Sequence, residues 1–394
     1  MEFPRFNFAR IPLIIFGAGK LALLPNLISQ YGTKVLFITG GGSYKAAGKW
    51  ELLSKALVEE KLELHHEIVH GEPTPEFVDE IAAKCRQIGI KVVVAIGGGS
   101  AVDAGKAMSA MIPESVPVAT LLEGIGTGAA HKGQKVPFIA VPTTAGTGSE
   151  ATKNAVLRRI GPEGFKNSLR HENLVPDIAL IDPELHVSCP REVTAACGLD
   201  AFTQLLEAYT SNIASPITDA LAFSGIEQIQ QAILETTGSG ALNVEVRARM
   251  AYGALLSGIT LANAGLGIVH GFASPIGGFF DIPHGVVCGT LLASATRVNI
   301  EVLKTTDGGR SIALEKYARV GNFWATDKKT TISKGCDLLV HKLQEWVDVL
   351  KIPKLGNYGV RKGDIDKILA KTGNKNNPIA LTKEQMREIL EERL

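Results

Sequence analysis

Short runs of β-branched and other apolar residues alternate with helical patterns throughout the first half of the chain, and this alternation constrains its fold more than any other feature. The apolar runs are continuous, which is typical of parallel strands that are buried on both faces of a sheet. The helical patterns between them supply the crossovers that parallel strands require. We therefore expect a Rossmann-like α/β domain with a parallel sheet. Its expected strands are 34–39, 62–69, 91–96, 137–141 and 177–181, and its expected helices are 47–60, 75–88 and 101–111.

The pattern changes at about Pro190, where long segments begin to carry apolar residues at i, i+3 and i+4. Pro190 interrupts both patterns and marks a junction. We predict an α/β dinucleotide-binding domain at 1–189 and an all-helical domain at 190–394, with a ligand site in the cleft between them at the carboxyl ends of the strands. The expected helices of the second domain are 195–209, 217–235, 244–264, 287–300 and 334–350.

Composition excludes several classes of function. The chain has 41 Lys+Arg against 40 Asp+Glu, so its net charge of +1 gives no electrostatic reason to expect nucleic acid or an anionic membrane as a partner. No uninterrupted apolar stretch approaches the ~18 residues of a membrane span, and the N-terminus lacks the features of a secretory signal. Five scattered cysteines without a C-x-x-C pair are typical of reduced thiols. We expect a cytoplasmic protein that binds neither membrane nor nucleic acid.

A run of three glycines and a serine follows the expected strand 91–96 and opens the next helix. Glycines at such a turn let the backbone approach a phosphate, and the free N–H groups and dipole of the helix N-terminus favour the anion. One glycine would be enough for a tight turn, so three in a row favour phosphate binding. The candidate residues are Gly97, Gly98, Gly99 and Ser100.

A second glycine-rich turn follows the expected strand 34–39. Dinucleotide folds often carry an acid at the end of this strand, where it binds the ribose hydroxyls and repels a 2′-phosphate. Glycine takes that position here, and open backbone N–H groups beside a serine and Lys45 suit a 2′-phosphate. We therefore expect NADP in preference to NAD. The candidate residues are Gly40, Gly41, Gly42 and Ser43.

Two further turns contain glycine. The segment 142–150 carries four hydroxyl residues and two glycines behind the expected strand 137–141, and we expect it to face a cofactor. The segment 17–22 fits G-x-G-x-x-A only superficially, because no acidic strand end follows at the required spacing, and we interpret it as a structural turn.

Candidates for metal binding lie in the helical half. Asp200 and Gln204 are four residues apart on a helical pattern, so both side chains project from one face. His270 and His284 follow, although isolated histidines are more often ordinary core or surface groups. A denser tract, His65, His66 and His70, lies on a strand pattern with interspersed acids, and we expect an exposed strand edge there.

Taken together, these motifs resemble the iron-containing alcohol dehydrogenase family over essentially the whole chain. The resemblance rests on several long strings in the family's order: FGAGKLALLP, GGGSAVDAGKA, VPTTAGTGSEAT, GLDAFTQLLEAY, GLGIVHGFASPIGG and DIPHGVVCG. It implies a dinucleotide-binding domain, a helical domain and one Fe²⁺ or Zn²⁺ ion between them. It also implies interconversion of an alcohol and an aldehyde or ketone with NAD(H) or NADP(H), and a homodimer, an assembly that is also common in general.

The resemblance assigns roles to individual residues. The pyrophosphate loop falls on 97–100, and the adenosine-ribose position falls on Gly40. The contacts of the hydroxyl-rich loop and of the segment after it fall on Thr143, Thr144, Thr147, Asn154 and Lys166. The catalytic metal ligands fall on Asp200, Gln204, His270 and His284.

The metal site departs from the family at two positions. Gln204 stands where the family has a ligating His, and Ser274 stands where it has a further His. Because an amide oxygen is a harder and usually weaker donor than an imidazole nitrogen, we expect Fe²⁺ or Zn²⁺ to be bound weakly or not at all. The alternative is a metal-free or catalytically altered NAD(P)-binding member with a sensing or scaffolding role.

Overall fold

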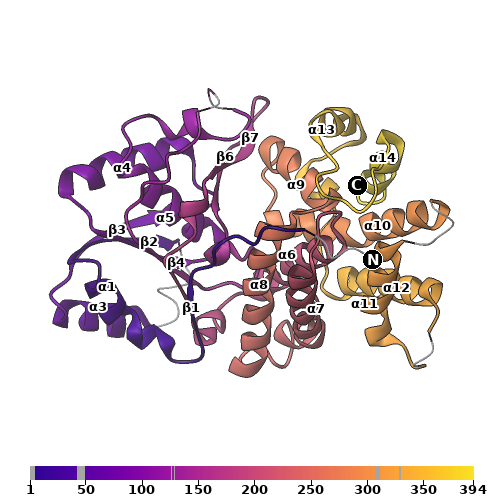
Figure 1. The fold of residues 1–394 in the computed structure, drawn as a ribbon, viewed down its shortest axis with the longest axis horizontal. Coiled ribbons are helices and arrows are strands. Elements are labelled where there is room, and N and C mark those ends of the chain that lie inside the picture. The colour runs from indigo at the N-terminus through magenta and orange to yellow at the C-terminus, as the bar shows by residue number, and fades with distance from the viewer. Residues whose placement is uncertain (1–4, 42–48, 126, 128, 307–310, 328–329) are drawn as a thin grey trace.

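The chain folds into a sheet-containing half and a helical half, as a computed structural model shows (Figure 1). The structure describes residues 5–41, 49–125, 127, 129–306, 311–327 and 330–394. The first half is built on a parallel six-stranded sheet and the second half is helical, so the expected fold class is confirmed.

All neighbouring strands of the six-stranded sheet are parallel, in the order β1-β8-β5-β4-β2-β3. The two strands at its centre, β4 and β5, are buried along their whole length, as their unbroken apolar sequences predict. The five expected strands are confirmed to within two residues at each end, whereas β1 was not expected because its apolar run is so short. The strands are β1 (Leu13–Phe16), β2 (Lys34–Gly40), β3 (Glu63–Val69), β4 (Val92–Gly97), β5 (Phe138–Pro142) and β8 (Ile178–Ile181).

An antiparallel hairpin, β6 (Asn154–Arg159) and β7 (Phe165–Arg170), lies between the sheet and the helical half (Figure 1). The sequence analysis did not predict it. Its apolar residues Ala155, Leu157 and Leu169 belong to the core beneath α5. The alternation of a strand therefore places the polar residues of the hairpin on the opposite face.

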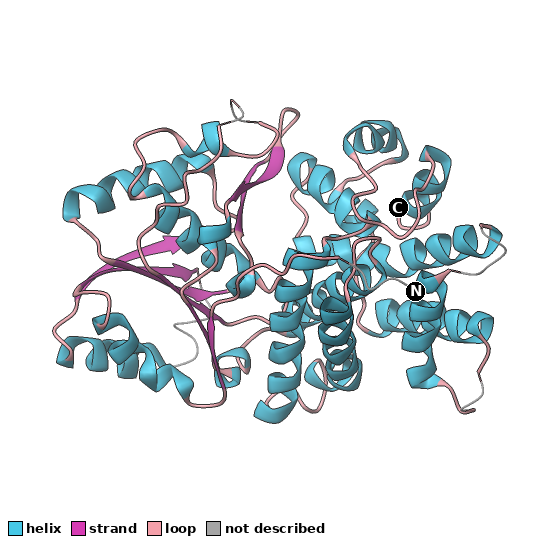
Figure 2. Ribbon diagram, viewed as in Figure 1, coloured by secondary structure: helices cyan, strands magenta, loops and turns pink. Residues whose placement is uncertain are grey.

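Helices cover both faces of the six-stranded sheet (Figure 2). On one side α4 and α5 share a core with strands β2, β4 and β5, and on the other side α1 and α3 do so. The α5 contact is close, because a Cβ at Gly105 would lie 2.8 Å from the Ala95 side chain. The helices of this half are α1 (Leu24–Ser29), α3 (Lys49–Glu59), α4 (Pro75–Ile88) and α5 (Gly99–Met111).

The second half consists of helices packed around α10 (His284–Thr305). By length and hydropathy α10 could cross a membrane, and so could the pair α8 and α9, which is bent by 99°, if it formed one span. However, 83% of the apolar window of α10 is buried inside the protein, which identifies α10 as a core helix. The five helices expected here are confirmed. The remaining helices are α6 (Arg191–Thr210), α7 (Pro216–Thr236), α8 (Val244–Ala264), α9 (Ile268–Phe279), α11 (Ile312–Gly321), α12 (Ile332–Val349), α13 (Ile365–Lys371) and α14 (Lys383–Glu391).

The two halves share part of their core along β8. Ile178 and Leu180 pack into the core beside α1 and α3, whereas Ala179 and Ile181 belong to the core of the helical half. The segment before β1 also reaches across, because the Ala9 N–H donates to Asn263 Oδ1 in α8 at 2.6 Å.

The glycine turn that follows β1 is held by the protein itself. The N–H groups of Gly19 and Leu21 donate to the two carboxylate oxygens of Asp182 at 3.2 and 3.0 Å. Gly19 has a φ of +75°, a conformation that favours glycine. These contacts support the interpretation of this segment as a structural turn.

Candidate active site

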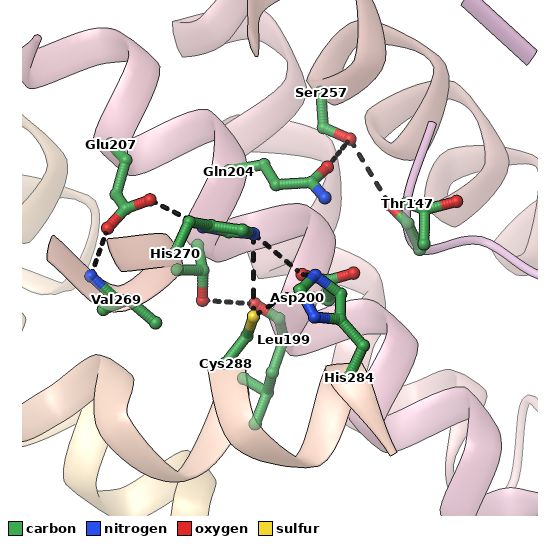
Figure 3. Close-up of polar contacts among 12 residues, drawn as sticks. Thr147, Leu199, Asp200, Gln204, Glu207, Ser257, Val269, His270, His284 and Cys288 are labelled. Carbon is green, nitrogen blue, oxygen red and sulfur yellow. Dashed lines mark hydrogen bonds and ion pairs between the residues drawn. The ribbon is translucent and has the colours of Figure 1, made fainter. Parts of the chain in front are cut away.

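Helices α6, α9 and α10 bring together the side chains of Asp200, His270, His284 and Cys288 (Figure 3). One potential ligand atom of each lies within 4.8 Å of the others. The sequence analysis proposed the first three residues and missed Cys288. Among the described residues, no other group of His, Cys, Asp and Glu has this spacing.

Asp200 carries the negative charge of this group. Its residue is 1% exposed, and its Oδ1 atom makes no hydrogen bond within the described part of the chain. The nearest nitrogens to Oδ1 are Nε2 of His270 at 3.3 Å and Nε2 of His284 at 3.7 Å. Burial alone would raise the pKa of the Asp200 carboxyl, but His284 and His270 outweigh it and hold that pKa below its usual value. A buried carboxylate oxygen without a hydrogen bond, facing two imidazoles, fits a divalent cation.

Glu207 orients His270. One oxygen of Glu207 accepts from His270 Nδ1 at 2.6 Å, and the other accepts from the Val269 N–H at 2.7 Å. With Nδ1 donating to this carboxylate, the Nε2 atom of His270 is left to face Asp200 and Cys288. Glu207 was missed, although its position seven residues after Asp200 on α6 places both side chains on one face of the helix.

His284 begins α10 directly after Pro283 and presents Nε2 to the same group. Burial lowers the pKa of His284 to about 3, and the nearby Lys166 ammonium contributes to this shift. Burial thus favours the neutral imidazole over the charged form, and a neutral imidazole is the form that binds a metal.

Gln204 lies one turn after Asp200, and its side chain is buried. Its Oε1 atom accepts from the Ser257 hydroxyl at 2.7 Å, and the Ser257 Oγ atom lies 3.3 Å from the Gly146 carbonyl oxygen. Figure 3 shows the Gln204 amide directed toward Ser257. Ser257 thus links α6 to the hydroxyl-rich loop. Ser274, at the other departure from the family, has its Oγ atom 3.5 Å from the His270 carbonyl oxygen of its own helix.

The glycine loop at 97–100 faces the hydroxyl-rich loop. A Cβ on Gly98 would lie 3.3 Å from Thr144 Oγ1, and one on Gly99 would lie 2.7 Å from Thr147 Oγ1. The Thr143 N–H donates to the Gly97 carbonyl oxygen at 2.9 Å, whereas Thr143 Oγ1 is buried without a hydrogen bond in the described chain. No side chain caps the start of α5 at Gly98, so N–H groups remain for an anion at Gly99 and Ser100. These features fit a dinucleotide pyrophosphate.

The two candidate cofactor contacts on the hairpin, Asn154 and Lys166, lie toward its opposite ends. Asn154 is opposite Arg170, and Lys166 is opposite Arg158. The Lys166 ammonium forms an ion pair with Glu72 at 2.6 Å and packs against Gly277 of α9, where a Cβ would lie 3.1 Å from its Cδ. Lys166 therefore lies beside α9, near the proposed ligand His284.

The end of β2 lies beside the glycine loop, because a Cβ on Gly97 would be 3.3 Å from the Gly40 nitrogen. Gly41 approaches His70, whereas Gly42 and Ser43 lie outside the described residues. The histidine tract is on β3 at the edge of the sheet, as expected, where His65 pairs with Glu63 at 3.0 Å and His66 contacts Thr39 at 2.8 Å.

Two family profiles match the chain. "Iron-containing alcohol dehydrogenase" matches residues 12–183, and "Fe-containing alcohol dehydrogenase family, C-terminal" matches residues 194–394. The chain belongs to the iron-containing alcohol dehydrogenase family. It is an NAD(P)-dependent alcohol dehydrogenase of this metal-dependent family of alcohol dehydrogenases and aldehyde reductases.

Individual relatives agree with this assignment. The chain is 32% identical to long-chain-alcohol dehydrogenase 1 of Geobacillus thermodenitrificans, over 91% of this chain and 87% of the relative. It is 31% identical to the NADPH-dependent butanol dehydrogenase of Clostridium saccharobutylicum, over 96% of this chain and 95% of the relative. Among solved structures, a 1,3-propanediol oxidoreductase superposes with a TM-score of 0.86 at 26% identity, over 99% of this chain and 100% of that one.

Proposed function

We propose that this iron-containing alcohol dehydrogenase family member reduces small aldehydes with NADPH at Asp200, His270 and His284. One observation carries the proposal: the Ser257 Oγ atom lies between Gln204 Oε1, at 2.7 Å, and the Gly146 carbonyl oxygen, at 3.3 Å. The loop that faces the glycine loop thus lies beside the helix that carries the proposed metal ligand Asp200. When bound, the nicotinamide supplies hydride and the divalent ion supplies positive charge for the aldehyde oxygen.

The residues of the chain have separate roles in this proposal. Asp200, His270 and His284 hold Fe²⁺ or Zn²⁺, and Glu207 keeps Nε2 of His270 facing the ion. Because Oε1 of Gln204 is engaged by Ser257, its Nε2 group remains to donate a hydrogen bond to the aldehyde oxygen. Gly97, Gly98, Gly99 and Ser100 bind the pyrophosphate, while Thr143, Thr144, Thr147 and Asn154 line the path to the nicotinamide. Lys166 closes the metal end of the cleft with Glu72.

An aldehyde assay tests this proposal. The protein is purified anaerobically and treated with EDTA, and oxidation of NADPH and NADH is followed with short aldehydes before and after Fe²⁺, Zn²⁺ or Mn²⁺ is restored. We expect turnover that returns with metal and favours NADPH. Tight NADPH binding without turnover under any ion contradicts the proposal and favours the metal-free alternative.

The preference for NADP rests on Gly40. No acid stands at the end of β2, and among the described residues, which leave out 42–48, a Cβ at Gly40 would meet no atom within 4 Å. This supports room for a 2′-phosphate beside Gly40. The relation to an enzyme described as NADPH-dependent supports the same preference.

We predict that Gly40→Asp lowers kcat/KM for NADPH at least tenfold relative to NADH, because the new carboxylate repels the 2′-phosphate. Steady-state kinetics with both cofactors checks this, and Gly40→Ala is the matched control for the added Cβ. An unchanged ratio of the two kcat/KM values would contradict the NADP preference.

The proposal also covers the domain division, the cellular location and the oligomeric state. We place the domain division at residues 189 and 190, at the start of α6. A cytoplasmic location is supported by five free cysteines. A homodimer is supported by apolar side chains at Phe6, Phe8, Ile11 and Leu13, which remain exposed beside the edge strand β1; sedimentation equilibrium tests it.

A further inference from the structure

Cys288 lies one turn after His284 on α10, so both side chains project from the same face of that helix. The residue is fully buried, and its Sγ atom lies 3.6 Å from Nε2 of His270 and 3.7 Å from Nε2 of His284. Figure 3 shows the sulfur directed toward Asp200 and the two imidazoles.

Four of the six distances between these donor atoms match the edges of a small tetrahedron, and all six are within 4.8 Å. With bonds of about 2.0–2.1 Å to nitrogen, about 2.0–2.2 Å to oxygen and about 2.3 Å to sulfur, tetrahedral zinc would separate nitrogen from oxygen by about 3.4 Å and nitrogen from sulfur by about 3.6 Å. The measured nitrogen–oxygen distances are 3.3 and 3.7 Å, and the nitrogen–sulfur distances are 3.6 and 3.7 Å.

Gln204 is less suited to the fourth position. Its amide oxygen already accepts from Ser257 at 2.7 Å, and coordination through that oxygen would break this bond. The buried Oδ1 of Asp200, in contrast, has no hydrogen bond in the described chain and faces the same space as the sulfur.

We infer that Cys288 replaces the missing histidine as the fourth metal ligand, beside Asp200, His270 and His284, and that the site selects zinc over iron. The thiol proton passes to solvent when Sγ binds the ion, so the ligand is a thiolate. A soft thiolate ligand favours Zn²⁺, whereas ligands that are all oxygen or nitrogen suit harder ions. This inference rests on the proposed function, since it requires an ion at the same three residues.

Cobalt substitution tests the ligand directly. The metal-free protein is titrated anaerobically with Co²⁺, and the near-ultraviolet thiolate-to-cobalt charge-transfer band is recorded together with the visible ligand-field bands. We expect both sets of bands in the wild type. In Cys288→Ala the charge-transfer band should disappear while weaker ligand-field bands remain, and Cys197→Ser, which alters the cysteine nearest to Asp200 in the sequence, should keep both.

Zinc binding provides the second measurement. Competition with a chelator should show that Cys288→Ala weakens Zn²⁺ binding by more than about 100-fold, because loss of a direct ligand costs more than the 10- to 100-fold loss seen for outer partners. Gln204→Ala should weaken it much less. X-ray absorption of the zinc form should contain one sulfur at about 2.3 Å.

The outcomes separate the two proposals. Ligand-field bands without a charge-transfer band in the wild type, or a larger loss of affinity in Gln204→Ala than in Cys288→Ala, would overturn the assignment of Cys288 and leave the proposed function intact. Failure of the wild type to bind Co²⁺ or Zn²⁺ at all would overturn both.

Discussion

Glu207 shows how a residue that does not touch the ion can set the properties of a metal site. Its carboxylate holds one nitrogen of His270 and the backbone that carries it, so the position and tautomer of the imidazole depend on it. A charged acceptor at this position also makes the imidazole a stronger donor to a metal.

We predict that Glu207→Gln weakens zinc binding by about 10- to 100-fold, because the amide orients His270 less firmly and carries no charge. A chelator competition assay measures the change. Glu192→Gln, at an exposed position on the same helix, is the control and should bind zinc like the wild type. Equal affinities for wild type and Glu207→Gln would show that the carboxylate does not position His270.

Glu150 gives a prediction about pH. It is 4% exposed, and burial raises the pKa of its carboxyl from 4.5 to about 7. Between these two values the folded protein binds more protons than the unfolded chain, so this residue makes the free energy of unfolding fall as pH rises.

Glu150→Gln removes this titration. We expect its free energy of unfolding, relative to the wild type, to increase from about pH 4.5 to 7 and then to level off. The total change should be roughly 3.5 kcal/mol at most, since one pKa unit is worth about 1.4 kcal/mol. Denaturation at a series of pH values measures it, with the exposed Glu163→Gln as control. A difference that is independent of pH would contradict the prediction.

The site was only partly predictable from single residues. Asp200, His270 and His284 were proposed because they match motifs, and the structure brings them together. Glu207 and Cys288 were missed because an acid and a thiol in apolar helices are unremarkable in isolation. Only the crossing of α6, α9 and α10 places them against the histidines.

At the scale of elements, the junction between β4 and α5 has a strict geometric requirement. A Cβ on Gly99 would lie 2.7 Å from Oγ1 and 2.9 Å from Cγ2 of Thr147, so the helix start and the hydroxyl-rich loop fit together only with glycine.

We predict that Gly99→Ala raises the dissociation constant for NADPH at least tenfold, because the added methyl group separates the two loops. Fluorescence titration with NADPH measures it. Gly363→Ala is the matched control, since a Cβ there would meet no atom within 4 Å. Unchanged binding in Gly99→Ala would show that this contact does not shape the cofactor site.

Element prediction succeeded where the sequence pattern is strong. The buried strands β4 and β5 and helices such as α4 were expected from their sequences, because unbroken apolar runs and amphipathic periods identify them. β1 has only four residues, and the hairpin β6–β7 mixes small apolar residues with arginine and lysine. β1 is defined by its pairing with β8, more than 160 residues along the chain, and the mixed composition of the hairpin gives no clear strand pattern.

At the scale of the whole molecule, β8 belongs to two cores at once. Ala179 and Ile181 pack with the helical half, whereas Ile178 and Leu180 pack with the sheet domain. The two halves therefore stabilise each other along this strand.

We predict that residues 1–189, expressed alone, do not unfold cooperatively, because one face of β8 would lose its cover. Circular dichroism during thermal unfolding, compared with the full chain, checks this. A sharp transition in the fragment at the temperature of the full chain would show that the sheet domain does not need the helical half.

The hydrogen bonds from Gly19 and Leu21 to Asp182 have a consequence for stoichiometry. The turns after β1 and β4 both have glycine-rich backbone, but the N–H groups of the turn after β1 already donate to a carboxylate from the other end of the domain. Asp182 acts as a built-in competitor that a free phosphate would have to displace. Of these two turns, only the one after β4 is left for a pyrophosphate, so the pair should bind one pyrophosphate rather than two.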